Sequence, residues 1–92
     1  MKWLEIIELR SVDRKRDQLK SILLKLIEEV DKETKRKSIR AFSRSNLDTD
    51  FSMHLFHESK KVNYNGTPLG LHLSSALKEF AFVNHTIWTE LH

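Results

Sequence analysis

The feature that most constrains the fold is a change of hydrophobic period along the chain. Between residues 13 and 34 the apolar residues recur at i, i+3, i+4, i+7, i+8 and i+11, a period near 3.6, and they are Leu19, Ile22, Leu23, Leu26, Ile27 and Val30. This stripe predicts an amphipathic helix over 13–34 with Ser11 or Asp13 as its N-cap. On either side of it the period falls to about two residues, which is typical of strands.

A second helical stripe follows Thr67 and Pro68, which form an N-cap followed by proline at the first helical position. Its apolar residues are Leu69, Leu73, Ala76, Leu77 and Phe80. The pattern predicts a helix over 68–83 that ends at Asn84, a residue that tolerates the left-handed conformation of a helix cap.

Four segments alternate apolar and polar side chains and predict strands. They cover residues 3–9, 37–45, 50–59 and 85–91, and the turn formers of residues 46–50 join the second and third into a hairpin. The order is therefore β-α-β-β-α-β. Right-handed crossovers then give a ferredoxin-like α+β fold over residues 1–92, with an antiparallel sheet of order 4-1-3-2 and both helices on one face.

Composition excludes several classes of protein. The 92 residues contain no cysteine, so disulfides and thiolate chemistry are absent. No apolar run approaches the roughly 18 residues of a membrane span, and the chain does not begin like a signal peptide, so we expect a soluble, cytoplasmic protein. The net charge of +3 comes from stretches in which acids and bases alternate, which favours a solvated surface over a nucleic-acid surface.

The two histidines of the third predicted strand do not form a metal site. His54 and His57 are an odd number of residues apart, so their side chains point to opposite faces of the sheet. We interpret His57 and the three remaining histidines as scattered surface residues without partners. The three are His72, His85 and His92. No cofactor-binding motif is present either, and we expect neither a metal nor a cofactor.

The face of the sheet without helices is predicted to be rich in aromatic residues. Because a buried charge needs a partner, Glu5 is placed on this open face, which also brings Trp3 and Ile7 there and turns Leu4 and Ile6 inward. On each of the other strands, the more apolar of the two alternating sets of side chains is assigned to the helix side and the other set to the open face. This adds to the open face Arg40, Phe42, Arg44, Ser52, His54, Phe56, Glu58, Thr86, Trp88 and Glu90. Four aromatics on an uncovered face indicate an interface or a ligand groove.

The β-α-β-β-α-β order, the length near 90 residues, the aromatic open face and the closing stretch NHTIWTEL resemble the dimeric α+β barrel superfamily, which includes the antibiotic-biosynthesis-monooxygenase-like domains. The resemblance implies a homodimer in which two sheets pack through their open faces around a lumen that holds a small aromatic or polyketide-like ligand, or haem. Monooxygenases of this kind use Asn and Trp with Arg or His, and no metal or flavin. The first predicted strand has no Asn, so no catalytic residue is assigned.

Six open-face residues are candidate ligand-binding residues: Trp88, His54, Arg40, Glu90, Trp3 and Phe56. The two tryptophans could stack on a planar ligand or pack against the sheet of the partner subunit.

The polar candidates also have two interpretations each. His54 could be a general base whose tautomer is set by Glu5 or Glu58, or it could hydrogen-bond within a dimer interface. Arg40 and Arg44 could bind a ligand carboxylate, or they could pair with Glu5 and Glu90.

Three classes of function remain open from the sequence. The first is a homodimeric barrel that binds or modifies a small molecule between the sheets; if it is an enzyme, the resemblance implies a cofactor-independent, monooxygenase-like or isomerase-like activity. The second is a structural or regulatory dimerisation module without catalysis. The third, an RRM-like RNA-binding domain, is disfavoured because residues 50–58 lack the basic-glycine-aromatic pattern of that family.

Overall fold

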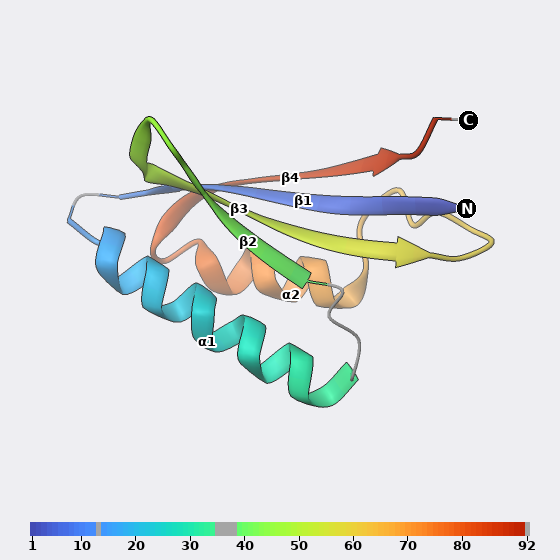
Figure 1. Ribbon diagram of the computed structural model, residues 1–92, viewed down its shortest axis with the longest axis horizontal. Helices are drawn as coiled ribbons and strands as arrows, with labels where there is room; N and C mark the ends of the chain where they lie inside the picture. Colours follow the sequence, from blue (N-terminus) through green and yellow to red (C-terminus); the bar gives the residue numbers. More distant parts are fainter. Residues whose placement is uncertain (13, 35–38, 92) are drawn as a thin grey trace.

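The elements follow one another in the predicted order. A computed structural model describes residues 1–12, 14–34 and 39–91 of the chain. Figure 1 shows the strands and helices, which are β1 (Lys2–Ser11), α1 (Arg16–Thr34), β2 (Ile39–Arg44), β3 (Leu47–Glu58), α2 (Pro68–Leu77) and β4 (Ala81–Thr89). The β-α-β-β-α-β arrangement is thus confirmed, while Asp13, residues 37–38 of the second predicted strand and His92 lie outside the described residues.

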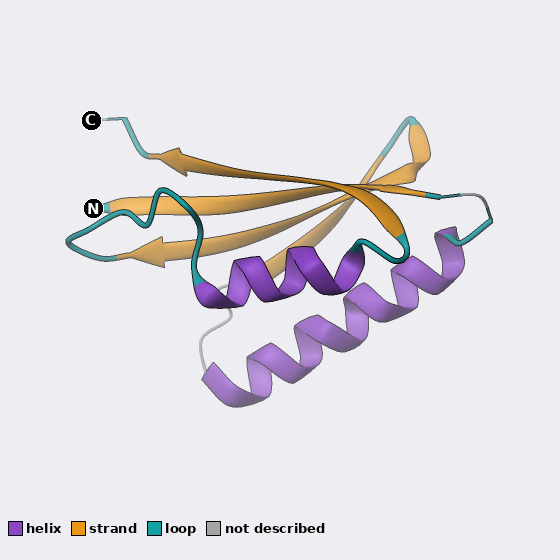
Figure 2. Ribbon diagram, turned by 180° about the vertical axis from the view of Figure 1, so that it is seen from behind, coloured by secondary structure: helices purple, strands orange, loops and turns teal. Residues whose placement is uncertain are grey.

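The four strands form one antiparallel sheet of order β2-β3-β1-β4, which is the predicted order read from the other edge. Both helices lie on the same face of this sheet, as Figures 1 and 2 show from opposite sides. The fold is therefore the expected ferredoxin-like α+β fold, and within the described chain no element covers the second face. No helix among the described residues is long and apolar enough to cross a membrane.

The core lies between the helices and the sheet. The stripe of α1 faces it as predicted, because Leu19, Leu23 and Val30 are buried and the other three members are partly buried against them. On α2 the buried stripe consists of Leu73 and Leu77.

Helix α2 is shorter than predicted, and β4 is longer. The helix ends at Leu77, and β4 begins at Ala81, so the predicted helix to residue 83 and the helix cap at Asn84 are both wrong. The reason is a second pattern in the same stretch: residues 81–89 alternate in side-chain direction and pair with β1 along their whole length.

The predicted N-cap of α2 is confirmed, since Thr67 Oγ1 accepts a hydrogen bond from Gly70 N–H at 3.0 Å. Ser11 belongs to β1 and is not a helix cap.

The prediction for the two faces of β1 is wrong. Trp3 is 5% exposed, and Glu5 and Ile7 are fully buried on the helix side. Leu4 and Ile6 therefore point to the open face, together with Glu8 and Arg10 further along the strand. The argument failed because the structure does supply partners for a buried Glu5.

Candidate functional site: an aromatic groove on the open face

Four aromatic side chains lie on the open face, as many as predicted, although one of them differs. They are Phe42 on β2, Phe56 on β3, and Phe82 and Trp88 on β4, with exposed fractions between 44% and 72%. Phe82 takes the place of Trp3, which was wrongly assigned to this face. It was missed because residues up to 83 were predicted to be helical.

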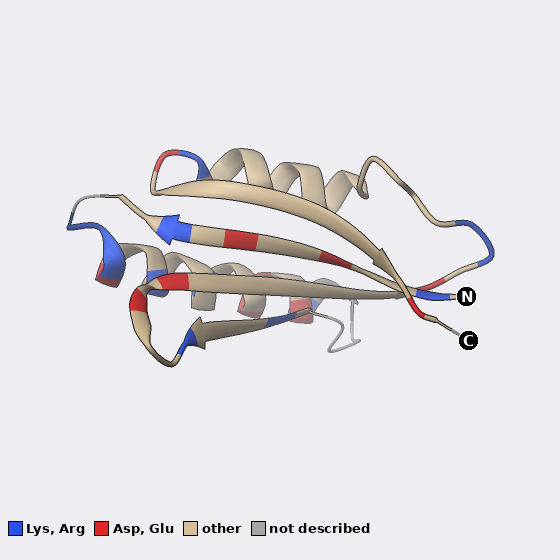
Figure 3. Ribbon diagram, turned by 90° about the horizontal axis from the view of Figure 1, so that it is seen from above, with Lys and Arg blue, Asp and Glu red and all other residues tan. Residues whose placement is uncertain are grey.

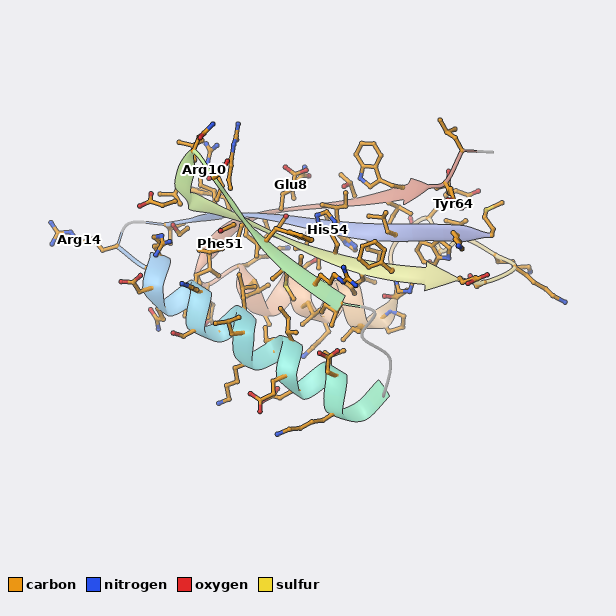
Figure 4. All side chains as sticks on the ribbon, viewed as in Figure 1. Glu8, Arg10, Arg14, Phe51, His54 and Tyr64 are labelled. Carbon is orange, nitrogen blue, oxygen red and sulfur yellow. The ribbon has the colours of Figure 1, made fainter. Side chains whose placement is uncertain are left out.

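A groove of about 680 Å³ runs over one half of this face. Its lining combines the aromatic rings of Phe42 and Phe82 with polar and charged groups, and it includes Ile6, Glu8, Arg10, Arg44, Asp50, Ser52, His54 and Asn84. Figure 4 shows Glu8 and Arg10 on the side of the sheet away from the helices. We call this the charged groove.

A second groove of about 490 Å³ lies over the other half, where β1 begins and β4 ends. Leu4, Phe56 and Trp88 give it a more apolar lining, with Glu90 at its rim. The indole of Trp88 is held in place by a 2.8 Å hydrogen bond from Nε1 to Thr86 Oγ1. Trp3 and His57 also border this apolar groove, although the hydrogen bonds of their side chains are on the helix side of the sheet.

His54 lies near the middle of the open face and touches aromatic rings. Its ring centroid is 4.9 Å from that of Phe42 and 6.2 Å from that of Phe56, and it lies opposite Arg40 in the β2–β3 register. Within the described residues its side chain makes no hydrogen bond. The proposed pairing of His54 with Glu5 is wrong, because the two side chains are on opposite faces, and Glu58 does not pair with it either.

One carboxylate bridges two arginines at the end of the charged groove. Asp50 on β3 accepts hydrogen bonds from Arg10 Nε at 3.1 Å, Arg10 Nη2 at 3.4 Å and Arg44 Nη1 at 3.4 Å. The hydrogen bond from Arg10 is the main reason that the pKa of Asp50 is lowered, and the same contact raises the pKa of Arg10. Arg44 thus pairs with Asp50, and its expected pairing with Glu5 and Glu90 is not found.

The charges of the open face are unevenly distributed. Figure 3, which looks onto this face, shows acidic and basic positions gathered where β1 ends and β3 begins, whereas β4 is uncharged along its length.

The six candidate ligand-binding residues do not all lie in one groove. Phe56, Trp88 and Glu90 meet in the apolar groove, His54 lies in the charged groove, Arg40 is exposed beside it, and Trp3 is not on this face.

The helix side contains a cluster that the sequence did not predict. The carboxylate of Glu5 accepts hydrogen bonds from the backbone N–H of Thr67 at 2.9 Å and from its Oγ1 at 2.6 Å. His57 Nε2 lies 2.7 Å from Oε2, and His85 Nε2 lies 2.9 Å from Oε1. His57 also stacks on Trp3, with ring centroids 4.3 Å apart. The interpretation of His57 and His85 as unpartnered surface residues is therefore wrong.

This cluster stabilises the ionised form of Glu5. Burial raises the pKa of Glu5, but the hydrogen bonds from Thr67 and the two histidines outweigh it, so that the pKa is lowered overall. The two imidazoles come from β3 and β4 on opposite sides of β1 and reach different oxygens. In keeping with this, no group of three or more metal-binding side chains suited to an ion occurs in the described part of the chain.

The two glycines of the chain make room for this carboxylate. A Cβ on Gly70 would overlap Glu5 Oε1, and a Cβ on Gly66 would overlap His85 Cε1. Gly66 also has a φ of 92°, which side chains disfavour. Because the hydrogen bonds of Glu5 join residues between 52 and 80 positions apart in the sequence, we regard the cluster as a structural centre that fixes α2 to the sheet.

Comparisons with known proteins support the fold and nothing finer. No protein-family model matches the chain, and no curated protein matches its sequence. Among solved structures, it is similar to a variant of SnoaB, a cofactor-independent oxygenase from Streptomyces nogalater. The TM-score is 0.71 at 9% sequence identity, over 99% of this chain and 94% of that one. The resemblance to the dimeric α+β barrel proteins is therefore confirmed at the level of the fold, and at this identity no activity is carried over.

Proposed function

We propose that this protein is a homodimer that binds a small aromatic molecule between the open faces of its two sheets. The observation that carries the proposal is the open face itself, on which four exposed aromatic rings border two adjoining grooves. Contiguous apolar surface of this kind is rare on a monomer and marks an interface or a ligand site.

The size and shape of the face favour a second copy as its cover. A four-stranded face ten residues long has a projected area of roughly 600 Å², from about 3.3 Å per residue and 4.8 Å between strands. Stable interfaces bury about 800 Å² per partner, so this face is of the right order. A sheet is also the natural partner for a sheet, because two such faces pack about 10 Å apart with interdigitating side chains.

The grooves favour a small ligand within that interface. Their volumes, about 680 and 490 Å³, fall in the range typical of small-molecule sites. In the proposed site Trp88 and Phe56 stack on a planar ring, His54 and Arg40 contact polar groups, and Glu90 lies at the rim. Trp3 is withdrawn as a ligand-binding residue because its side chain is buried on the other face.

Sedimentation and a ligand titration test the proposal together. At micromolar concentration the protein should sediment at twice the chain mass of 10.9 kDa. A planar two-ring probe such as 2-naphthamide should quench the exposed Trp88 in a saturable way, and calorimetry should show that Trp88→Phe weakens binding about three- to tenfold, the range expected for one aromatic stacking contact, without dissolving the dimer.

Leu24→Ala is the matched control, because Leu24 is equally exposed but lies on α1. It should leave both mass and affinity unchanged. A monomer would contradict the proposal, while a dimer that binds no probe would favour the dimerisation module without a ligand.

A further inference from the structure

We propose that the ligand of the charged groove is an aromatic carboxylate, and that Arg10 and Arg44 bind its carboxylate group. This inference goes beyond the proposed function, because it concerns the charged groove and not the adjoining apolar groove, in which Trp88 and Phe56 are proposed to stack on a ligand. It is carried by the way in which Asp50 holds two guanidinium groups together at one end of a groove with aromatic walls.

The two arginines are positioned by the sheet. Their strands, β1 and β2, lie on either side of β3, and Asp50 on β3 is directly opposite Arg10 in the register. One carboxylate therefore gathers two long side chains from different strands and limits their freedom. Pre-organised guanidinium groups lose less entropy when they bind a ligand.

The hydrogen bonds at this end leave donors unused and acceptors occupied. Asp50 Oδ1 accepts from Arg10 Nε and from Thr49 Oγ1, and Oδ2 accepts from Arg10 Nη2 and Arg44 Nη1. Both oxygens thus have two donors each. By contrast, Arg10 Nη1 and Arg44 Nε and Nη2 make no hydrogen bond among the described residues, and the two side chains are 63% and 61% exposed.

A ligand group that enters here must therefore supply acceptors. A carboxylate does so with two oxygens in the geometry that fits the edge of a guanidinium group. The local charges permit one negative charge: Arg10, Arg40 and Arg44 face Glu8 and Asp50 on this half of the sheet. A dianion such as phosphate is disfavoured by the same two carboxylates.

The aromatic part of the ligand is indicated by the walls beside the arginines. Phe42 and Arg44 both line the charged groove from β2, and Phe82 borders it from β4. A planar ring between these two phenyl groups would place its carboxylate at the arginines.

Two probes of the same shape test this inference. 2-Naphthoate and 2-naphthamide differ in charge but hardly in size, and the wild-type dimer should bind the acid about tenfold more tightly, as expected for a charge-assisted hydrogen bond. Arg44→Gln should reduce that preference to less than about threefold and leave the affinity for the amide unchanged. The control Arg14→Gln removes the same charge from an exposed side chain outside the groove and should keep the preference.

The outcomes separate this inference from the proposed function. If both probes bind equally well to the wild-type protein, or if Arg44→Gln retains the preference, the inference is wrong and the aromatic site stands. If Arg44→Gln dissociates the dimer, the arginines belong to the interface and the inference is overturned. If neither probe binds, the proposed function fails and the inference fails with it.

Discussion

At the scale of single residues, Glu5 stands out as the charged residue that is fully buried among the described residues. It is a fully buried carboxylate in the middle of the interior strand β1, with four hydrogen bonds to three residues, which are His57 on β3, His85 on β4 and Thr67 at the start of α2. A buried charge of this kind is tolerated only while its partners remain in place.

We expect Glu5→Gln to destabilise the protein by about 1 to 3 kcal/mol, the range for hydrogen bonds to a charged group. The amide keeps the shape of the side chain, but its NH₂ faces groups that now donate to Glu5. The measurement is chemical denaturation at neutral pH. Glu58→Gln, an exposed position on β3, is the control and should change stability by less than about 0.5 kcal/mol. Equal stability of the Glu5 variant and the wild type would show that the cluster is not structural.

Because the pKa of Glu5 is lowered, the difference in stability between the wild type and Glu5→Gln should depend on pH in a defined way. Because the folded pKa lies below the ordinary value of 4.5, the stabilisation is fully present above pH 4.5 and is lost as the pH falls through the folded pKa. The gap in stability between wild type and Glu5→Gln should therefore be constant at neutral pH and shrink in acid. A gap that grows in acid would contradict the assignment of Glu5 as the ionised acceptor.

The face of β1 could have been predicted from a longer stretch of sequence. Over residues 3–9 both faces contain apolar residues and one acid, so the rule against buried charges decided the prediction, and it decided wrongly. Leu9, the last residue of that strand, lies on the face of Trp3, Glu5 and Ile7, and extending the strand to residue 11 adds Arg10 to the other face, which favours the arrangement that the structure has. The partners of Glu5 could not be predicted, because no local pattern reveals that His57, His85 and Thr67 meet.

At the scale of elements, the position of α2 depends on close contact between its first turn and β1. Gly70 lies in this turn and touches Glu5, which is why a side chain there would collide with the carboxylate.

We expect Gly70→Ala to lower the melting temperature, although the same change in a helix normally stabilises a protein by about 0.5 to 1 kcal/mol. The added Cβ overlaps Glu5 Oε1 and must displace either the carboxylate or the helix. Ser75→Ala, at an exposed position of the same helix, is the control and should be neutral or stabilising. If Gly70→Ala also stabilises, α2 does not contact Glu5 as closely as the structure indicates.

The elements were predicted more reliably than their ends. The stripe of α1 is unambiguous because six apolar residues agree with one period, whereas residues 80–84 satisfy both a helical stripe and a strand alternation. Pairing with β1 decides in favour of the strand, and a single-sequence pattern does not contain that information. Because of this error, Phe82 was not predicted to lie on the open face, although it belongs to the candidate site.

At the scale of the whole molecule, the described chain has two layers and one uncovered face. The core between the helices and the sheet is complete without a partner, since its largest side chains are fully buried. Covering the open face would therefore add stability without changing the fold. That contribution should depend on protein concentration, because a dimer is favoured by mass action.

We expect the melting temperature of the wild-type protein to rise by several degrees between about 1 and about 100 µM, as mass action requires for a dimer that unfolds to monomers. Phe56→Lys should abolish this dependence, because it places a charge in the middle of the aromatic surface, where each copy would meet the same charge of its partner. The fold of the monomer should survive, since Phe56 is 44% exposed and outside the core. Leu24→Lys, with 59% exposure on α1, is the control and should keep the concentration dependence. If the melting temperature of the wild type is the same at both concentrations, the open face is not the interface that holds two copies together. Any ligand of the grooves would then bind to a monomer.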